Sequence, residues 1–155
     1  MSSRFRFNAW MLSSTLAIAA LWPCMASAAL GQPESSVQAD SARLQGSIKD
    51  LDRGTFRVHE IKLPSGTLVR EYAGLDGVVF AVAWNGPFIP DMRQTLGSYF
   101  ASYAAAAKSK HADHRHLQIE LSDLVVQASG HMRAWSGRAY LPQAIPAGVS
   151  LGDVT

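Results

Sequence analysis

Residues 63–91 read LPSGTLVREYAGLDGVVFAVAWNGPFIPD, and this stretch decides the fold. Pro64-Ser65-Gly66 predicts a tight turn, because proline presets the first corner residue and glycine accepts the left-handed conformation. The segments on either side of it, residues 55–63 and 67–73, are therefore expected to pair as a hairpin. After a second turn, VVFAVAW at residues 78–84 is apolar at both parities, which predicts a central strand covered on both faces.

The first strand of this hairpin, TFRVHEIKL, places its apolar side chains on two faces. Phe56 and Val58 share one parity, whereas Ile61 and Leu63 share the other. Either a bulge in the middle of the strand or a strand that exchanges its buried face would produce this pattern.

A helix is expected over residues 91–107. Asp91 followed by Gln94 fits a capping box at its start. One apolar stripe recurs at helical spacing along it, formed by Met92, Leu96, Tyr99 and Tyr103. Gly97 lies inside this helix and weakens it by about 1 kcal/mol relative to alanine.

The last third of the chain returns to strand patterns. Residues 116–121 alternate between apolar and polar side chains, and the pattern breaks at 122–123 and resumes over 124–128. Residues 132–141 form a further expected strand, in which Gly137 marks a bulge or a close approach of another group. The tail is expected to end as a short edge strand near residues 149–154.

These elements predict an α+β fold. We expect a twisted antiparallel sheet of about five strands, with one main helix packed on one face, in the order β-β-β-α-β-β. The domain is expected to span residues 55–155, preceded by a polar lead-in over residues 29–54. In that lead-in, Val37, Ser41 and Leu44 share one face of a possible short helix.

Residues 1–28 are typical of a cleaved secretory signal peptide. Arg4 and Arg6 precede an apolar run at residues 9–22, and Ala26-Ser27-Ala28 supplies a small-residue cleavage site. The run is shorter than the roughly 20 residues of a membrane span. We therefore expect a periplasmic or secreted protein with no stable membrane span after cleavage, and an uncleaved N-terminal anchor is the alternative.

Charge and cysteine content restrict the partners further. The chain has 14 Lys and Arg residues and 12 Asp and Glu residues, and loss of Arg4 and Arg6 would make the two numbers equal. A near-neutral domain lacks the basic surface of nucleic-acid-binding proteins, so we expect no nucleic-acid partner. Cys24, the single cysteine, would leave with the signal peptide, and the mature chain would be held by packing alone.

Several motifs, in order along the chain, resemble one known family. They are LPSGTLVREY, GVVFAVAWNGP, PDMRQTLGSYF, SGHMRAWSGRAYLP and the IPAGV tail, which follow the signal peptide. Together they resemble an uncharacterised family of exported bacterial proteins, domain-of-unknown-function family 2844, from about residue 30 to residue 154. The resemblance implies export from a Gram-negative bacterium and a small single domain. It implies no reaction, cofactor or ligand.

Polar and aromatic residues in the strands suggest a candidate binding surface. Arg70 and Glu71 point to opposite faces, and we expect Arg70 to pair with an acid on a neighbouring strand, the alternative being an anion-binding arginine beside Tyr72. Trp84 and Trp135 are either core residues or an exposed stacking platform. The full candidate surface comprises Arg70, Glu71, Tyr72, Trp84, Asn85, His131, Arg133, Trp135 and Arg138.

Two further constellations of residues have simpler interpretations than a metal site or a catalytic triad. One is a histidine run with the spacing of metal ligands, formed by His111, His114 and His116. The lysine and arginine side chains next to it repel a cation. We therefore interpret the run as a solvated linker and predict no metal or other cofactor. Ser129, His131 and Asp123 offer the residue types of a catalytic triad. Ser129 and His131 lie only two residues apart and no nucleophile-elbow motif is present, which disfavours a triad.

Two functional hypotheses follow from these patterns. The first is a non-enzymatic binding or interaction module of the bacterial envelope, whose partner is an envelope protein or a glycan. The alternative is a small periplasmic hydrolase acting on a cell-wall or polysaccharide substrate, with Glu71, Asp91 or His131 as acid or base. A concave pocket would favour the enzyme if it gathered Arg70, Glu71, Trp84 and His131, whereas a flat or convex face with these groups dispersed would favour the binding module.

Overall fold

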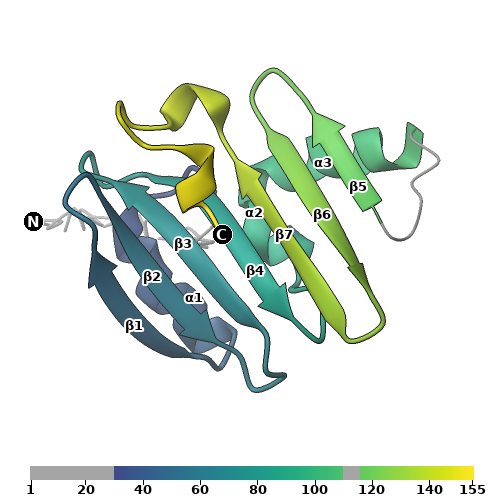
Figure 1. Ribbon diagram of the computed structural model, residues 1–155, viewed down its shortest axis with the longest axis horizontal. Helices are drawn as coiled ribbons and strands as arrows, with labels where there is room; N and C mark the ends of the chain where they lie inside the picture. The colour runs from purple at the N-terminus through teal and green to yellow at the C-terminus, as the bar shows by residue number, and fades with distance from the viewer. Residues whose placement is uncertain (1–29, 110–115) are drawn as a thin grey trace, which may run out of the picture.

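A seven-stranded antiparallel sheet forms the centre of the computed structural model, which describes residues 30–109 and 116–155. The strand order is β1-β2-β3-β4-β7-β6-β5, so β4 lies at the middle of the sheet (Figure 1). The strands are β1 Ser47–Asp52, β2 Phe56–Lys62, β3 Leu68–Gly74, β4 Val79–Gly86, β5 His116–Glu120, β6 Val125–His131 and β7 Ala134–Tyr140.

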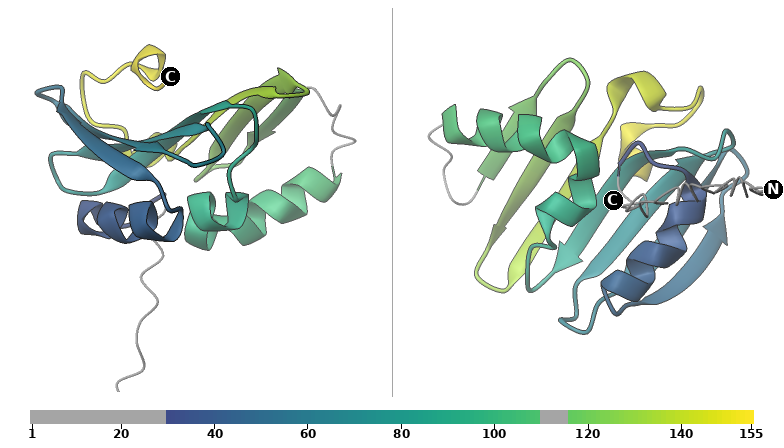
Figure 2. Two further views of the ribbon diagram at one scale, coloured as in Figure 1. Left: turned by 90° about the horizontal axis from the view of Figure 1, so that it is seen from below. Right: turned by 180° about the vertical axis from the view of Figure 1, so that it is seen from behind.

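The two faces of the sheet are covered by different parts of the chain (Figure 2). One face, called the helix face here, carries the three helices and two 3₁₀ turns: η1 Glu34–Ser36, α1 Val37–Arg43, α2 Met92–Leu96, η2 Gly97–Tyr99 and α3 Phe100–Ser109. The segment after β7 crosses the opposite face, called the tail face, with the 3₁₀ turns η3 Pro142–Ala144 and η4 Leu151–Asp153. The tail leaves the β5–β6 side of its face open.

Each face has its own hydrophobic core, and β4 contributes to both. Val82 and Trp84 belong to the helix-face core, whereas Ala81 and Ala83 belong to the tail-face core. This double burial is why residues 78–84 are apolar at both parities, as the central-strand prediction required.

Strand β2 exchanges its buried face. Phe56 and Val58 pack in the tail-face core and Ile61 in the helix-face core. Its register with β3 is continuous along the whole strand, so the face exchange explains the parity switch without a bulge. The irregularity of this region lies instead between Tyr72 and Ala73, where the register of β3 with β4 shifts.

The α+β class is confirmed, but the prediction of about five strands is wrong. Strand β1 comes from the expected lead-in and pairs with β2 over its full length. Its sequence, SIKDLD, shows little apolar alternation because five of its six side chains are exposed at the edge of the sheet. The break at residues 122–123 is a hairpin turn, in which the Leu121 amide donates to the Leu124 carbonyl at 2.8 Å, so the expected interrupted strand is two strands, β5 and β6.

The expected single helix over residues 91–107 is also wrong. Gly97 has a φ of 52°; it caps the end of α2 and begins η2, which leads into α3. A positive φ is accessible to glycine at low cost but does not belong to a right-handed helix, so the chain turns at this residue. Asp91 caps α2 as predicted, because its Oδ1 accepts the amides of Arg93 at 2.9 Å and Gln94 at 3.4 Å. The expected tail strand at residues 149–154 is also absent, since η4 occupies this segment.

Candidate functional site

The nine residues of the candidate surface lie on both faces of the sheet. Strand alternation and register assign Glu71, Trp84 and Trp135 to the helix face and Arg70, Tyr72, Asn85, His131 and Arg138 to the tail face, with Arg133 in the β6–β7 turn. The tail-face residues are spread over β3, β4, β6 and β7. The structure therefore does not bring the nine residues together at one site.

Arg70 and Tyr72 hold the C-terminal segment. The Arg70 Nε donates to Glu60 Oε1 at 2.7 Å, which is the cross-strand ion pair that alternation suggested. Its Nη1 donates to the Thr155 carbonyl oxygen at 2.8 Å, and the Tyr72 hydroxyl donates to the same oxygen at 2.8 Å. Tyr72 is buried, and this burial raises the pKa of its phenol. Neither residue is part of an exposed stacking surface.

Arg138 binds the same segment from β7. Its Nε donates to Gln127 Oε1 at 2.9 Å, and its Nη1 donates to the Leu151 carbonyl oxygen at 2.6 Å. Since the tail is held by side chains of both β3 and β7, it forms a fixed cover over the middle of the tail face.

A cleft remains between the tail and strands β1–β3. It has a volume of about 400 Å³, and its charged lining side chains are Arg53, Glu60, Arg70 and Asp153. Glu60 and Arg70 neutralise each other across it through their ion pair.

Replacing Tyr72 with phenylalanine is expected to loosen the tail while leaving the sheet folded. The change removes the hydroxyl that donates to the Thr155 carbonyl oxygen and accepts the Thr155 amide at 3.1 Å. A net loss of about 1 kcal/mol per hydrogen bond is typical. Amide hydrogen exchange should increase at residues 149–155 and stay unchanged in β6. Equal protection of the tail in both proteins would show that Arg70 and Arg138 hold it without the Tyr72 hydroxyl.

Trp84 is a core residue of the helix face, with 3% of its surface exposed. Its indole lies over Gly137, where an added Cβ would lie 2.4 Å from Trp84 Cζ2. The close approach predicted at Gly137 is thus the packing of the indole against the β7 backbone. Trp135 is half-buried, beside Gly130 in the neighbouring strand. The two tryptophans do not form an exposed platform.

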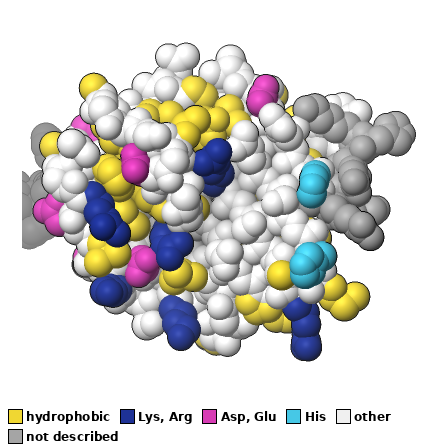
Figure 3. Space-filling view, viewed as in Figure 1, with side chains coloured by type: hydrophobic (Ala, Val, Ile, Leu, Met, Phe, Trp, Pro, Cys, Tyr) yellow, Lys and Arg dark blue, Asp and Glu magenta, His cyan; other side chains and the backbone are white. Residues whose placement is uncertain are grey.

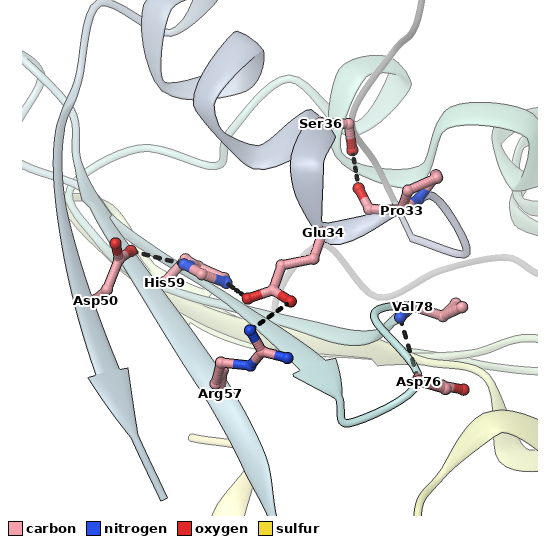
Figure 4. Close-up of polar contacts among 8 residues, drawn as sticks. All are labelled: Pro33, Glu34, Ser36, Asp50, Arg57, His59, Asp76 and Val78. Atoms are coloured by element: carbon pink, nitrogen blue, oxygen red, sulfur yellow. Dashed lines mark hydrogen bonds and ion pairs between the residues drawn. The ribbon is translucent and has the colours of Figure 1, made fainter.

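A cluster of charged residues that no sequence motif predicted joins the N-terminal segment to the helix face. His59 of β2 lies between two carboxylates, with Nδ1 at 2.6 Å from Asp50 Oδ1 and Nε2 at 2.9 Å from Glu34 Oε1 (Figure 4). Arg57 Nη1 lies 3.1 Å from the second oxygen of Glu34. Because both ring nitrogens face carboxylates, His59 is not available as a base for a nucleophile in this arrangement.

A separate pair of acidic side chains is buried between α1 and the sheet. Asp40 is 2% exposed and Glu71 is 3% exposed, and Glu71 stands directly opposite His59 in the β2–β3 register. Burial, followed by the negative charge of Asp40 and a hydrogen bond with it, raises the pKa of Glu71 to about 8. Glu71 therefore carries a proton at neutral pH and donates it in a hydrogen bond to the Asp40 carboxylate.

One sequence feature pointed to this pair. Asp40 lies three residues after Val37 and one before Ser41, which places it on the same face of the expected short helix. An acid on the buried face of a helix needs a partner, and Glu71 was the polar residue on the inward parity of β3. Because the two residues are separated by 31 positions in the sequence, no local pattern could predict that they pair.

Only part of the predicted histidine run falls within the described residues. His111 and His114 lie outside the described ranges, and His116 begins β5. In residues 30–109 and 116–155, no group of three His, Cys, Asp or Glu side chains has the arrangement of a metal site.

The uncovered part of the tail face displays uncharged polar groups in register. Gln127 stands between Arg138 of β7 and Gln118 of β5, and Ser129 stands opposite Ser136. Figure 3 shows this side of the face as a broad region with few charged or hydrophobic side chains. It is an open surface of mainly uncharged polar groups beside the tail, which also carries His116, opposite Ser129, and Glu120, whose Oε1 accepts a hydrogen bond from the Gln118 amide at 2.7 Å.

Comparisons with known proteins give one finding. No curated protein and no solved structure matches the chain. Among the described helices, none is long and apolar enough to cross a membrane. A family model matches residues 26–154, which include every strand and helix described above. The chain belongs to the family described as protein of unknown function DUF2844.

Proposed function

We propose that this protein is exported to the bacterial envelope and acts there as a non-catalytic binding module. The observation that supports this function is the separation of its acid and base candidates. Glu71 is buried under α1, Asp91 caps α2, and His131 is exposed at the end of β6. A hydrolase needs these groups within reach of one bound substrate, and here each occupies a different part of the molecule.

The binding surface in this proposal is the open part of the tail face. Ser129 and Ser136 face each other across β6 and β7, and Gln118 lies on the adjacent β5. Amides and hydroxyls donate and accept hydrogen bonds without carrying charge. A hydroxyl-rich ligand such as an envelope glycan suits this chemistry, and an envelope protein is the alternative partner.

The tail-side cleft favours a second candidate function. Its lining includes two carboxylates, Glu60 and Asp153, and a pair of carboxylates is what most glycoside hydrolases use. A small hydrolase acting on a polysaccharide would place its substrate there. Loss of polysaccharide cleavage in a Glu60→Gln variant would support this function over the binding module.

The binding proposal predicts that Ser129→Arg abolishes capture of the partner. The residue is exposed, and a long cation on the open face would block a ligand lying flat across the strands. Residues 29–155, which contain both cores, would carry a tag and be crosslinked in isolated envelopes, followed by identification of bound glycans and proteins.

Export makes a separate prediction. Sequencing of the N-terminus after expression with residues 1–28 should show cleavage after Ala28.

The matched control is Ser122→Arg, at an exposed serine in the β5–β6 turn at the far end of the sheet. Capture that is lost in Ser129→Arg and kept in Ser122→Arg would place the partner on the open face. Equal capture by both variants would contradict that placement. Absence of any captured glycan or protein would contradict the binding module itself.

A further inference from the structure

Exposed hydrophobic side chains gather at one end of the sheet. This end, called the basic end here, is where β2, β4 and β6 finish and where β3 and β7 begin. Phe88 is 54% exposed and Ile89 45% in the loop after β4, and Met132 is 86% exposed in the β6–β7 turn. Leu75, 66% exposed, lies at the opposite end, between β3 and β4.

The two apolar tips stand on a rigid base. The Thr67 hydroxyl donates to the Phe88 carbonyl oxygen at 2.8 Å, which ties the loop after β4 to the start of β3. Gly86 pairs with Trp135 at the junction of β4 and β7, so the loop and the β6–β7 turn project from neighbouring strands. The exposure of Phe88 and Met132 is therefore imposed by ordered strands.

Exposed cations surround these tips. Lys62 ends β2, Arg133 follows Met132, and Arg43 lies in the last turn of α1. Lys49, Lys62 and Glu60 line a depression of about 380 Å³ beside them. Glu60 is paired with Arg70, whereas neither lysine forms an ion pair within the described ranges. Figure 3 shows Lys and Arg side chains along the lower border of the molecule, with hydrophobic side chains between them.

The acids are distributed differently. Asp91 is the acidic side chain next to the apolar loop, and its carboxylate accepts the α2 amides. At the opposite end, the turns and strand ends carry four acids, Asp52, Asp76, Glu120 and Asp123, and one exposed arginine, Arg53, in the β1–β2 turn. The domain is thus polarised, although its total charge is close to neutral, and the apolar tips stand at its positive end.

We propose that the basic end docks on an anionic phospholipid surface. Phe88, Ile89 and Met132 would enter the boundary between headgroups and acyl chains, while Lys62 and Arg133 contact lipid phosphates. Each cation near such a surface contributes about 1 kcal/mol. The apolar side chains stand on separate convex tips rather than in a groove, and a fluid lipid surface can close around such tips. This inference adds a location to the proposed function and does not depend on the ligand of the open face.

Vesicle co-sedimentation tests this docking. Residues 29–155 would be mixed with vesicles of phosphatidylcholine alone or of phosphatidylcholine with phosphatidylglycerol. We expect binding to the anionic vesicles only, weakening as salt is added. The double variant Phe88→Ser and Met132→Ser should reduce partitioning at least about tenfold, since both side chains lose burial in the lipid. Lys62→Glu with Arg133→Glu should reduce it similarly.

Leu75→Ser is the matched control, because it removes an equally exposed hydrophobic side chain at the acidic end. It should bind within about twofold of the unchanged chain. Urea unfolding midpoints should be equal in all variants, since every substituted side chain is exposed. Absence of binding to anionic vesicles, or an equal loss in Leu75→Ser, would overturn the proposal. Neither result would bear on capture of a glycan by the open face.

Discussion

Replacing Glu71 with glutamine is expected to make the protein more stable above neutral pH and to remove much of its pH dependence. Glutamine has the size of glutamic acid, and its amide can donate to Asp40 as the protonated carboxyl does. It carries no proton that is lost as pH rises. The variant keeps the hydrogen bond of the buried pair and excludes its doubly ionised form.

The sign of the effect follows from the proton balance. The pKa of Glu71 is raised from 4.5 to about 8 in the folded protein. Between these values the folded state holds a proton that the unfolded state has released, so the free energy of unfolding falls as pH rises. One protonation contributes about 1.4 kcal/mol per pH unit, or up to about 4 kcal/mol between pH 5 and pH 8. Above pH 8 the contribution levels off.

Urea unfolding at pH 5, 6, 7 and 8 would measure this effect. The free energy of unfolding of Glu71→Gln minus that of the unchanged chain should increase steadily over the series. The matched control is Glu120→Gln on β5, which removes an exposed carboxylate without touching the buried pair. If the difference grew equally in Glu120→Gln, net charge rather than the Asp40–Glu71 pair would explain the trend. A constant difference in Glu71→Gln would mean that Glu71 is ionised in the folded state.

The sheet could be anticipated from sequence wherever burial imposed a clear period. The apolar run at residues 78–84 predicted the central strand, and the proline and glycine at 64–66 predicted the hairpin. Strand β1 could not be recognised, because an exposed edge strand shows no apolar alternation. The helix break at Gly97 had a visible cause, but a single glycine is also tolerated inside helices, so its effect depended on tertiary packing.

The side-chain partners were harder to anticipate than the strands. Alternation assigned Arg70 and Glu71 to opposite faces, and that much was correct. What each side chain meets depends on segments far away in sequence. Arg70 meets Thr155 and Glu71 meets Asp40, at positions that no local period connects. The alternation of a strand determines the face to which each side chain points. Whether that side chain is exposed for binding or buried in the structure depends on the segments that cover the face.

Replacing Trp84 with alanine is expected to destabilise the fold strongly. The indole is 3% exposed and fills the helix-face core against β7. Loss of a buried tryptophan costs about 3–5 kcal/mol, a large share of the stability of a small domain. Urea unfolding should give this loss, and Trp135→Ala, at a half-buried tryptophan, should give a smaller one. An equal loss at both positions would contradict the core assignment of Trp84.

The same contact can be examined from the β7 side. A Cβ at position 137 would lie 2.4 Å from Trp84 Cζ2 and 2.8 Å from the Gln127 carbonyl oxygen. Gly137→Ala should therefore cost about 1–3 kcal/mol or more through overpacking. In the Trp84→Phe background the smaller ring vacates part of this space, so the same change should cost less, and a double-mutant cycle would give the coupling between the two positions. Additive losses would mean that the Gln127 carbonyl alone excludes a side chain at position 137. A coupled result would establish that the Trp84 indole packs against the β7 backbone at position 137 and supports the sheet there.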